Sequence, residues 1–142
     1  MGLYEKQKAK EITTDKLEIK RIVQSALSEM SSIVGSTLGP GGRTVLMERD
    51  NLAPLATKDG VTVAKAVGMA NAQASVVVEA AKEICLRTAK EAGDGTTTAI
   101  VLANALVQNA SNFLEAHPKY NPQRMINDLN KLYELVVVSF LK

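Results

Sequence analysis

Aromatic residues and cysteine are scarce in this chain. Of its 142 residues only 4% are aromatic, none is tryptophan, and Cys85 is the single cysteine. One cysteine excludes an intramolecular disulfide, and its apolar neighbours Ile84 and Leu86 predict a buried, unreactive thiol rather than a nucleophile. Because alanine and valine are abundant where aromatic residues are few, we expect closely packed helices rather than a sandwich of strands.

An excess of charge of one sign is also lacking. The chain carries 17 basic and 15 acidic residues, a net charge of +2, and no clustered basic stretch of the kind that nucleic-acid binding requires. No apolar run approaches the roughly 20 residues that span a bilayer, and the first residues lack the basic-then-apolar pattern of a secretory signal. We therefore expect one domain with neither a nucleic-acid nor a membrane partner, in the cytoplasm.

Apolar residues recur at three- and four-residue spacing in four segments, which predicts a mainly α-helical fold. The first predicted helix starts at the capping pair Asp15 and Glu18, and the second runs from about 73 to 92. The third begins near Thr96, and the fourth begins after the capping residue Asn121. The first stops at the glycine- and proline-rich segment 39–42. The last has no glycine or proline after its apolar stripe, so we interpret it as a junction with further chain. In the second, the predicted inward residues are Val76, Val77, Ala80, Ala81, Ile84 and Ala89.

A short β-hairpin is predicted between the first two long helices. The β-rich stretch 44–47 forms its first strand, a turn around Asp50 and Asn51 reverses the chain, and residues 55–57 return. A short helix is expected to begin near Val61.

The segment 92–99, Ala-Gly-Asp-Gly-Thr-Thr-Thr-Ala, is the strongest motif. Two glycines flank Asp94 directly before a predicted helix, which leaves free backbone N–H groups at a helix amino terminus, where phosphate binds well. Three threonine hydroxyls add donors, and Asp94 suits Mg²⁺, which prefers one or two carboxylates plus substrate phosphates. The same residues also fit an ordinary helix start, capped by threonine, with nothing bound.

Two further segments carry possible chemistry. The glycines of segment 37–43, Thr-Leu-Gly-Pro-Gly-Gly-Arg, permit close approach of the backbone to a ligand. No lysine follows Gly42, so the Walker phosphate-loop pattern is absent, and by itself this segment favours a bare turn. In segment 57–60, Thr-Lys-Asp-Gly, Asp59 could act as a general base or hold a metal-bound water. Alone, this segment also fits a simple turn.

Taken in order, the segments 37–43, 57–65 and 92–99 resemble the amino-terminal part of the equatorial, ATP-binding domain of chaperonins. The second segment and the arginine after Gly-Pro-Gly-Gly are similar to the group I branch. The resemblance covers roughly residues 19–141. It implies that residues 1–142 form the amino-terminal part of a helical bundle with a small β-hairpin. The carboxy-terminal part of a longer chain would complete that bundle, and the hinge and apical domains are not present here.

The resemblance also implies a set of site residues. The nucleotide contacts it implies are Thr37, Leu38, Gly39, Pro40, Lys58, Asp94, Gly95, Thr96, Thr97 and Thr98. Of these, Asp94 would bind Mg²⁺, and residues 95–98 would cradle the phosphates of ATP through N–H groups and hydroxyls. Asp59 is the implied catalytic residue, which positions or activates the attacking water. The candidate contacts of a K⁺ ion are Thr37, Lys58 and Thr97.

The function implied is ATP binding and hydrolysis in a homo-oligomeric ring that folds unfolded client proteins. Whether a lid co-chaperonin is a further partner stays open. The chain departs from the family pattern at Gly41, where lysine is usual, in the first twenty residues, and in segment 68–75. These departures fit a divergent viral or otherwise unusual chaperonin.

Two alternatives remain at this point. One is a truncated, catalytically inactive chaperonin remnant that acts as an interaction module. The other is an unrelated phosphate-binding enzyme whose glycine-threonine loop resembles the chaperonin motif by chance. The presence of all three motifs in the family's order makes this alternative the weaker one.

Overall fold

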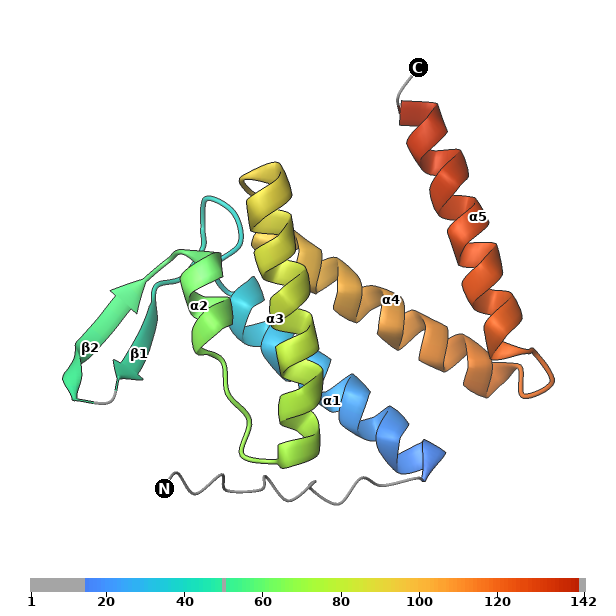
Figure 1. Ribbon diagram of the computed structural model, residues 1–142, viewed down its shortest axis with the longest axis horizontal. Coiled ribbons are helices and arrows are strands. Elements are labelled where there is room, and N and C mark those ends of the chain that lie inside the picture. Colours follow the sequence, from blue (N-terminus) through green and yellow to red (C-terminus); the bar gives the residue numbers. More distant parts are fainter. Residues whose placement is uncertain (1–14, 50, 141–142) are drawn as a thin grey trace, which may run out of the picture. The chain divides into compact units, whose positions relative to one another are not determined.

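The computed structural model describes residues 15–49 and 51–140 and shows a mainly helical protein with an antiparallel hairpin (Figure 1). In chain order, the elements are α1 (Lys16–Gly35), β1 (Val45–Arg49), β2 (Leu52–Thr57), α2 (Gly60–Ala66), α3 (Ala72–Ala92), α4 (Thr96–Ala116) and α5 (Pro122–Phe140). The predicted long helices, short helix and hairpin are confirmed. The chain divides into two compact units, one up to Val107 and one from Gln108 on, and each is described by itself.

Side-chain caps begin four of the helices. The capping residues are Asp15 for α1, Asp59 for α2, Asn71 for α3 and Asn121 for α5. In α1, for example, the N–H of Leu17 donates to the Asp15 carboxylate over 2.9 Å. A cap of this kind stabilises a helix by about 1 kcal/mol because it satisfies an N–H group that has no partner within the helix. The predicted caps Asp15 and Asn121 are thus confirmed.

The core of the first unit lies where α1, α2 and α3 pack on one another, with the beginning of α4 against them. Its buried hydrophobic residues are Ala26, Leu27, Met30, Val34, Val63, Ala64, Val67, Val78, Ala81, Cys85 and Ile100. In α1 these residues recur at the three- and four-residue steps that the sequence predicted. Each large side chain that is fully buried stabilises the fold by roughly 1.5–3 kcal/mol.

The predicted inward face of α3 was partly wrong. Val76 and Ile84 are 71% and 46% exposed, and Ala80 is exposed as well. The buried residues of α3 are Val78, Ala81 and Cys85. The reason is that apolar residues lie on more than one face of this helix, so the partner helices, and not the spacing alone, select the buried face. Cys85 is 0% exposed, which confirms its predicted burial, and its low reactivity stays a prediction.

Strands β1 and β2 form a two-stranded antiparallel sheet. Its register pairs Val45 with Thr57 and Met47 with Leu55, and the pairing becomes irregular between Met47 and Arg49. Strand β2 starts at Leu52, three residues before the predicted start at residue 55. In the predicted turn, Asn51 takes a left-handed φ of 57°, which asparagine tolerates better than most residues, and Asp50 lies outside the described residues.

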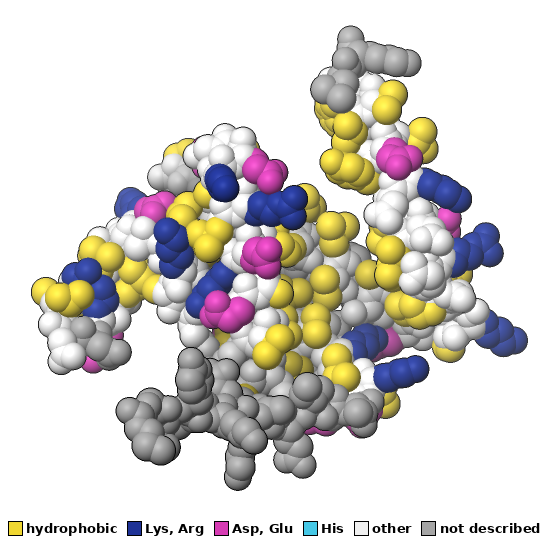
Figure 2. Space-filling view, in the orientation of Figure 1, with side chains coloured by type: hydrophobic (Ala, Val, Ile, Leu, Met, Phe, Trp, Pro, Cys, Tyr) yellow, Lys and Arg dark blue, Asp and Glu magenta, His cyan; other side chains and the backbone are white. Residues whose placement is uncertain are grey.

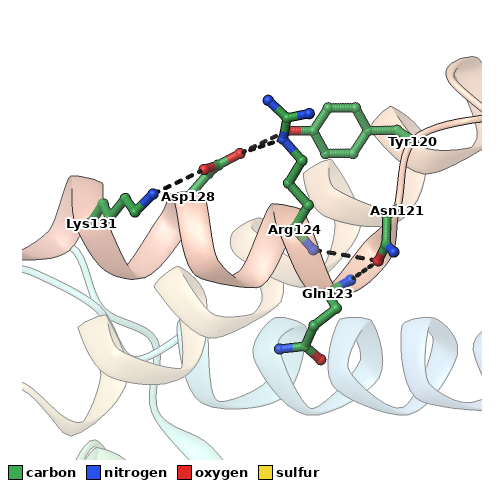
Figure 3. A network of polar contacts seen from close by, with 6 residues as sticks. All are labelled: Tyr120, Asn121, Gln123, Arg124, Asp128 and Lys131. Carbon is green, nitrogen blue, oxygen red and sulfur yellow. Dashed lines mark hydrogen bonds and ion pairs between the residues drawn. The ribbon is translucent and has the colours of Figure 1, made fainter.

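The second unit consists of the end of α4, a turn, and α5. At the turn, the Tyr120 hydroxyl donates to Asp128 over 2.8 Å, and the Arg124 guanidinium lies 5.7 Å from the Tyr120 ring centre (Figure 3). The N–H of Gln123 donates to Asn121 over 2.8 Å. These local contacts fix the reversal of the chain between the two helices.

Helix α5 has no buried residue. Its apolar stripe is at the surface, and Figure 2 shows hydrophobic side chains along this helix. The exposed apolar residues of α5 include Ile126, Leu129, Leu132, Tyr133, Leu135, Val136, Val138 and Phe140. None of the helices described here contains an apolar stretch of the length needed to span a bilayer.

Candidate functional site

The three sequence motifs meet at one cleft in the first unit. The cleft has a volume of about 400 Å³ and is lined by residues 37–39, 58–61 and 93–98. These segments come from the end of α1, the start of α2 and the start of α4. The fold therefore brings together residues that are up to about 60 positions apart in the chain, as the combination of motifs predicted.

The turn between α3 and α4 is made possible by two glycines. Gly93 and Gly95 have φ angles of 75° and 88°, a left-handed conformation that residues with a side chain rarely adopt. Gly93 ends α3, and its N–H donates to the carbonyl of Ala89. Asp94 is held between them, where its carboxylate accepts the N–H of Gly95 over 2.6 Å.

Helix α4 begins without a side-chain cap. Gly95 occupies the capping position, since its carbonyl accepts the N–H of Ala99 over 2.8 Å, and glycine has no side chain to offer. The other four helices that the structure describes are capped by an aspartate or asparagine. The first N–H groups of α4, those of residues 96–98, thus line the cleft at the positive end of a helix dipole. A bound anion can satisfy them.

Asp94 is the exposed carboxylate nearest to this helix start. The described residues hold no group of three or more His, Cys, Asp or Glu side chains that could bind a metal ion by themselves. A single carboxylate beside an anion-binding helix start fits Mg²⁺, which takes its remaining ligands from phosphates and water. A metal such as zinc, which needs three or four protein ligands, does not fit.

Asp59 also lines the cleft and serves as the cap of α2. Its carboxylate accepts the N–H of Val61 over 3.2 Å, the N–H of Thr62 over 2.9 Å, and the Thr62 hydroxyl. The hydrogen bond from the Thr62 hydroxyl is the main reason why the pKa of Asp59 lies below the usual value of an aspartate. Asp59 is therefore a carboxylate, and not a carboxylic acid, at neutral pH.

The hydroxyls of Thr37 and Thr97 join the two motifs that flank α2. The Thr37 hydroxyl donates to the carbonyl of Val34 over 2.7 Å and lies 3.3 Å from the Thr97 hydroxyl. A hydroxyl has one proton, so in the contact between the two threonines Thr97 is the donor. The free lone pairs of the Thr97 oxygen suit a cation or a water molecule better than a phosphate oxygen.

Thr96 differs from its two neighbours because its side chain points into the core. It is 4% exposed, and its hydroxyl donates to the carbonyl of Cys85 over 3.5 Å. In return, the Cys85 thiol lies 3.9 Å from the carbonyl of Thr96. Only the backbone N–H of Thr96, and not its hydroxyl, is available to a ligand, which narrows the predicted role of this residue.

The site differs from the prediction at a few residues. Pro40, a predicted nucleotide contact, is exposed and is not among the residues that line the cleft. Gly60, Val61 and Gly93 line the cleft although none of them was predicted as a site residue. The signal for both glycines was present, since each sits next to a predicted aspartate.

Comparison with known proteins identifies the family of this chain. The model of the TCP-1/cpn60 chaperonin family matches residues 30–140. A similar solved structure is the chaperonin gp146 from the bacteriophage EL 2 (Pseudomonas aeruginosa), crystallised in the presence of ATP-BeFx. One crystal form is 34% identical with a TM-score of 0.65 over 78% of this chain and 19% of that chain. A second form is 39% identical with a TM-score of 0.59 over 62% of this chain and 16% of that chain.

The present chain thus spans less than a fifth of the length of that phage chaperonin. The family match covers most of the chain, including the three segments that line the cleft. The order of the motifs, their convergence and the family match lead to one conclusion. The chain belongs to the TCP-1/cpn60 chaperonin family.

Proposed function

We propose that this chain is the amino-terminal part of the ATP-binding, equatorial domain of a ring-forming chaperonin. The observation that carries the proposal is the uncapped start of α4, which faces a cleft lined by all three motifs. Members of the family are ATPases and typically form rings. In this proposal, the complete protein hydrolyses ATP to drive the folding of unfolded client proteins, and it belongs to the group I branch.

The residues of the cleft divide the work of holding ATP. The N–H groups of residues 96–98 hold the phosphates and Asp94 holds Mg²⁺, while the N–H of Gly95 donates to the Asp94 carboxylate. The segment 37–39 lies beside the base and sugar. Bound Mg²⁺ supplies positive charge that neutralises the phosphates. Thr37, Lys58 and Thr97 remain the candidate contacts of K⁺, and the lone pairs of the Thr97 hydroxyl favour this role.

Asp59 is proposed to orient the attacking water rather than to take up its proton early in the reaction. A general base is most effective when its pKa lies near the working pH, and the pKa of Asp59 is instead lowered by the hydrogen bonds from Thr62 and Val61. A carboxylate that is always ionised can still accept a hydrogen bond from a water and place it. Positioning of this kind carries much of the catalysis in phosphoryl transfer.

The proposal is tested by replacing Asp94 with alanine in the full-length protein. We expect Mg²⁺-dependent ATP turnover to be lost while the far-UV circular dichroism spectrum is unchanged, because Asp94 is exposed and caps no helix. Glu91→Ala is a matched control, since Glu91 is an exposed acid three residues away that pairs with Arg87 and does not line the cleft. Turnover that survives in Asp94→Ala would reject the metal-ligand assignment.

The mass of the protein in solution tests the assembly. The denatured mass of the chain and the native mass of the particle together decide between the ATPase and the remnant. A large ring built from a chain several times longer than these residues supports the proposal. A small particle with a chain near 15.2 kDa would favour the inactive remnant.

A further inference from the structure

The start of α2 and the start of α4 approach each other very closely at the cleft. Three residues form this contact, which we call the Thr37–Gly60–Thr97 junction. Gly60 is the first residue of α2, Thr97 is the second residue of α4, and Thr37 follows α1. The contact therefore joins all three segments that line the cleft.

Gly60 has no room for a side chain. A Cβ atom at this position would collide with the Thr97 hydroxyl oxygen, and it would lie 3.4 Å from the Thr37 hydroxyl oxygen. The distance to the Cβ of Thr97 would be an ordinary 3.6 Å. The Thr97 hydroxyl is therefore the group that excludes a side chain at position 60.

The same hydroxyl is fixed from its other side. It donates to Thr37, whose own proton goes to the carbonyl of Val34, and Thr37 is 9% exposed. The Thr97 oxygen is thus held between a buried acceptor and the bare backbone of Gly60. Because Thr97 belongs to the first turn of α4, a clash with its side chain that rotation about χ1 does not relieve displaces the N–H groups of that turn.

We propose that Gly60 is a positioning residue of the cleft, whose missing side chain lets Thr97 reach Thr37 and so fixes the first turn of α4 for the nucleotide phosphates. This inference rests on the proposed function. It assigns Gly60 no direct part in the chemistry. It explains why glycine, and not another residue, follows the capping Asp59.

An opposite expectation follows from helix propensity alone. Gly60 lies within α2 and does not have a positive φ angle, so alanine at this position should favour the helix. The collision of the new Cβ with the Thr97 hydroxyl has the opposite effect, so Gly60→Ala destabilises the protein while Thr97 is present. If the hydroxyl is removed by Thr97→Ala, the same Gly60→Ala change stabilises it.

The experiment is a double-mutant cycle in the full-length protein. The variants are Gly60→Ala, Thr97→Ala and the double variant, with Gly68→Ala as the matched control because a Cβ at Gly68 meets no atom within 4 Å. Tm and the Kd for Mg-ATP are measured for each. We expect Gly60→Ala to lower Tm and to weaken Mg-ATP binding by roughly tenfold, the size of a lost hydrogen bond to a charged group. In the Thr97→Ala background, Gly60→Ala should raise Tm and leave the Kd unchanged. Gly68→Ala should leave the Kd unchanged.

Several outcomes would overturn the inference. Equal effects of Gly60→Ala on Tm in both backgrounds would show that the two residues do not couple. A Gly60→Ala variant with a lower Tm but an unchanged Kd would show a structural role alone. A wild-type protein that binds no Mg-ATP would overturn the proposed function itself. In that case the Tm cycle still decides whether the junction positions α4.

Discussion

Asp59 has one observed role and one proposed role, and a single substitution can separate them. Its carboxylate caps α2 by accepting the N–H groups of Val61 and Thr62, and it is the proposed orienting group for the attacking water. Asparagine keeps the side-chain oxygen that caps a helix but removes the negative charge. Alanine removes both. The pair Asp59→Asn and Asp59→Ala therefore tests the cap and the charge independently.

The size of the cap effect follows from the structure. Loss of a capping side chain costs about 1 kcal/mol, and α2 is only seven residues long, so it has few other helical hydrogen bonds to hold it. Its buried Val63 and Ala64 are part of the core. We expect Asp59→Ala to lower the free energy of unfolding by roughly 1–2 kcal/mol and Asp59→Asn to lower it by much less.

The effect on turnover should be different. Both variants lose the carboxylate that orients the water, so we expect both to lower kcat for ATP hydrolysis by roughly a hundredfold, with a smaller change in the Kd for Mg-ATP. The assays are chemical denaturation for stability, steady-state ATPase for kcat, and equilibrium nucleotide binding for Kd. Near-normal kcat in Asp59→Asn, or a loss of Kd equal to the loss of kcat, would refute the orienting role and leave Asp59 a cap only.

The pH dependence of this group has a definite sign. The pKa of Asp59 is lower in the folded protein than in the unfolded chain, so its carboxylate stabilises the fold above the unfolded pKa. That contribution is lost as the pH falls through the folded pKa. Titration of Asp59 should therefore cause no acid limb in the ATPase profile between pH 5 and 8, and an acid limb in that range that disappears in Asp59→Asn would contradict the assignment.

Three further predictions concern α3 and the turn that follows it. Gly93→Ala should lower the free energy of unfolding by about 1–2 kcal/mol, because Gly93 has a φ of 75°, whereas Gly68→Ala, measured by the same denaturation assay, should not. Cys85 is fully buried, and burial raises the pKa of its thiol, so a thiol reagent at pH 8 should label it only after denaturation, as intact mass will show. Cys85→Val and Val78→Ile each enlarge a buried side chain of α3 and should both lower Tm. Only Cys85→Val should also weaken Mg-ATP binding, because only Cys85 contacts Thr96.

Many of the helix ends in this fold could be predicted from residues close to them in the sequence. Helix starts could be predicted to within a few residues from Asp15 and Asn121, because a cap acts on N–H groups two or three positions away. The end of α3 could be predicted from the glycines near position 93, which break the helix. The core face of α3 was not predictable in the same way. Val76 and Val78 are the same residue type two positions apart in α3. Packing against α1 and α2 decides that Val78 is buried, whereas Val76 is 71% exposed.

The site shows the same division between local and non-local information. Asp94 and the flanking glycines could be predicted because the anion-binding turn is built from consecutive residues. The role of Gly60 could not, because the atom that excludes a side chain there belongs to Thr97, 37 positions further along the chain. Pro40 shows the reverse case, since residues 37–39 of its motif line the cleft and Pro40 does not.

The three consecutive threonines of α4 show why a repeated residue type need not have a repeated role. Successive side chains of a helix are about 100° apart around its axis, so three neighbours cannot face the same way. Thr96 is 4% exposed and bonds to the backbone of Cys85, Thr97 reaches Thr37, and Thr98 is exposed. The first threonine thus anchors the helix in the core and the second sets its distance from α2. The N–H groups of all three remain directed at the cleft, because backbone donors at a helix start point along the axis whatever the side chains do.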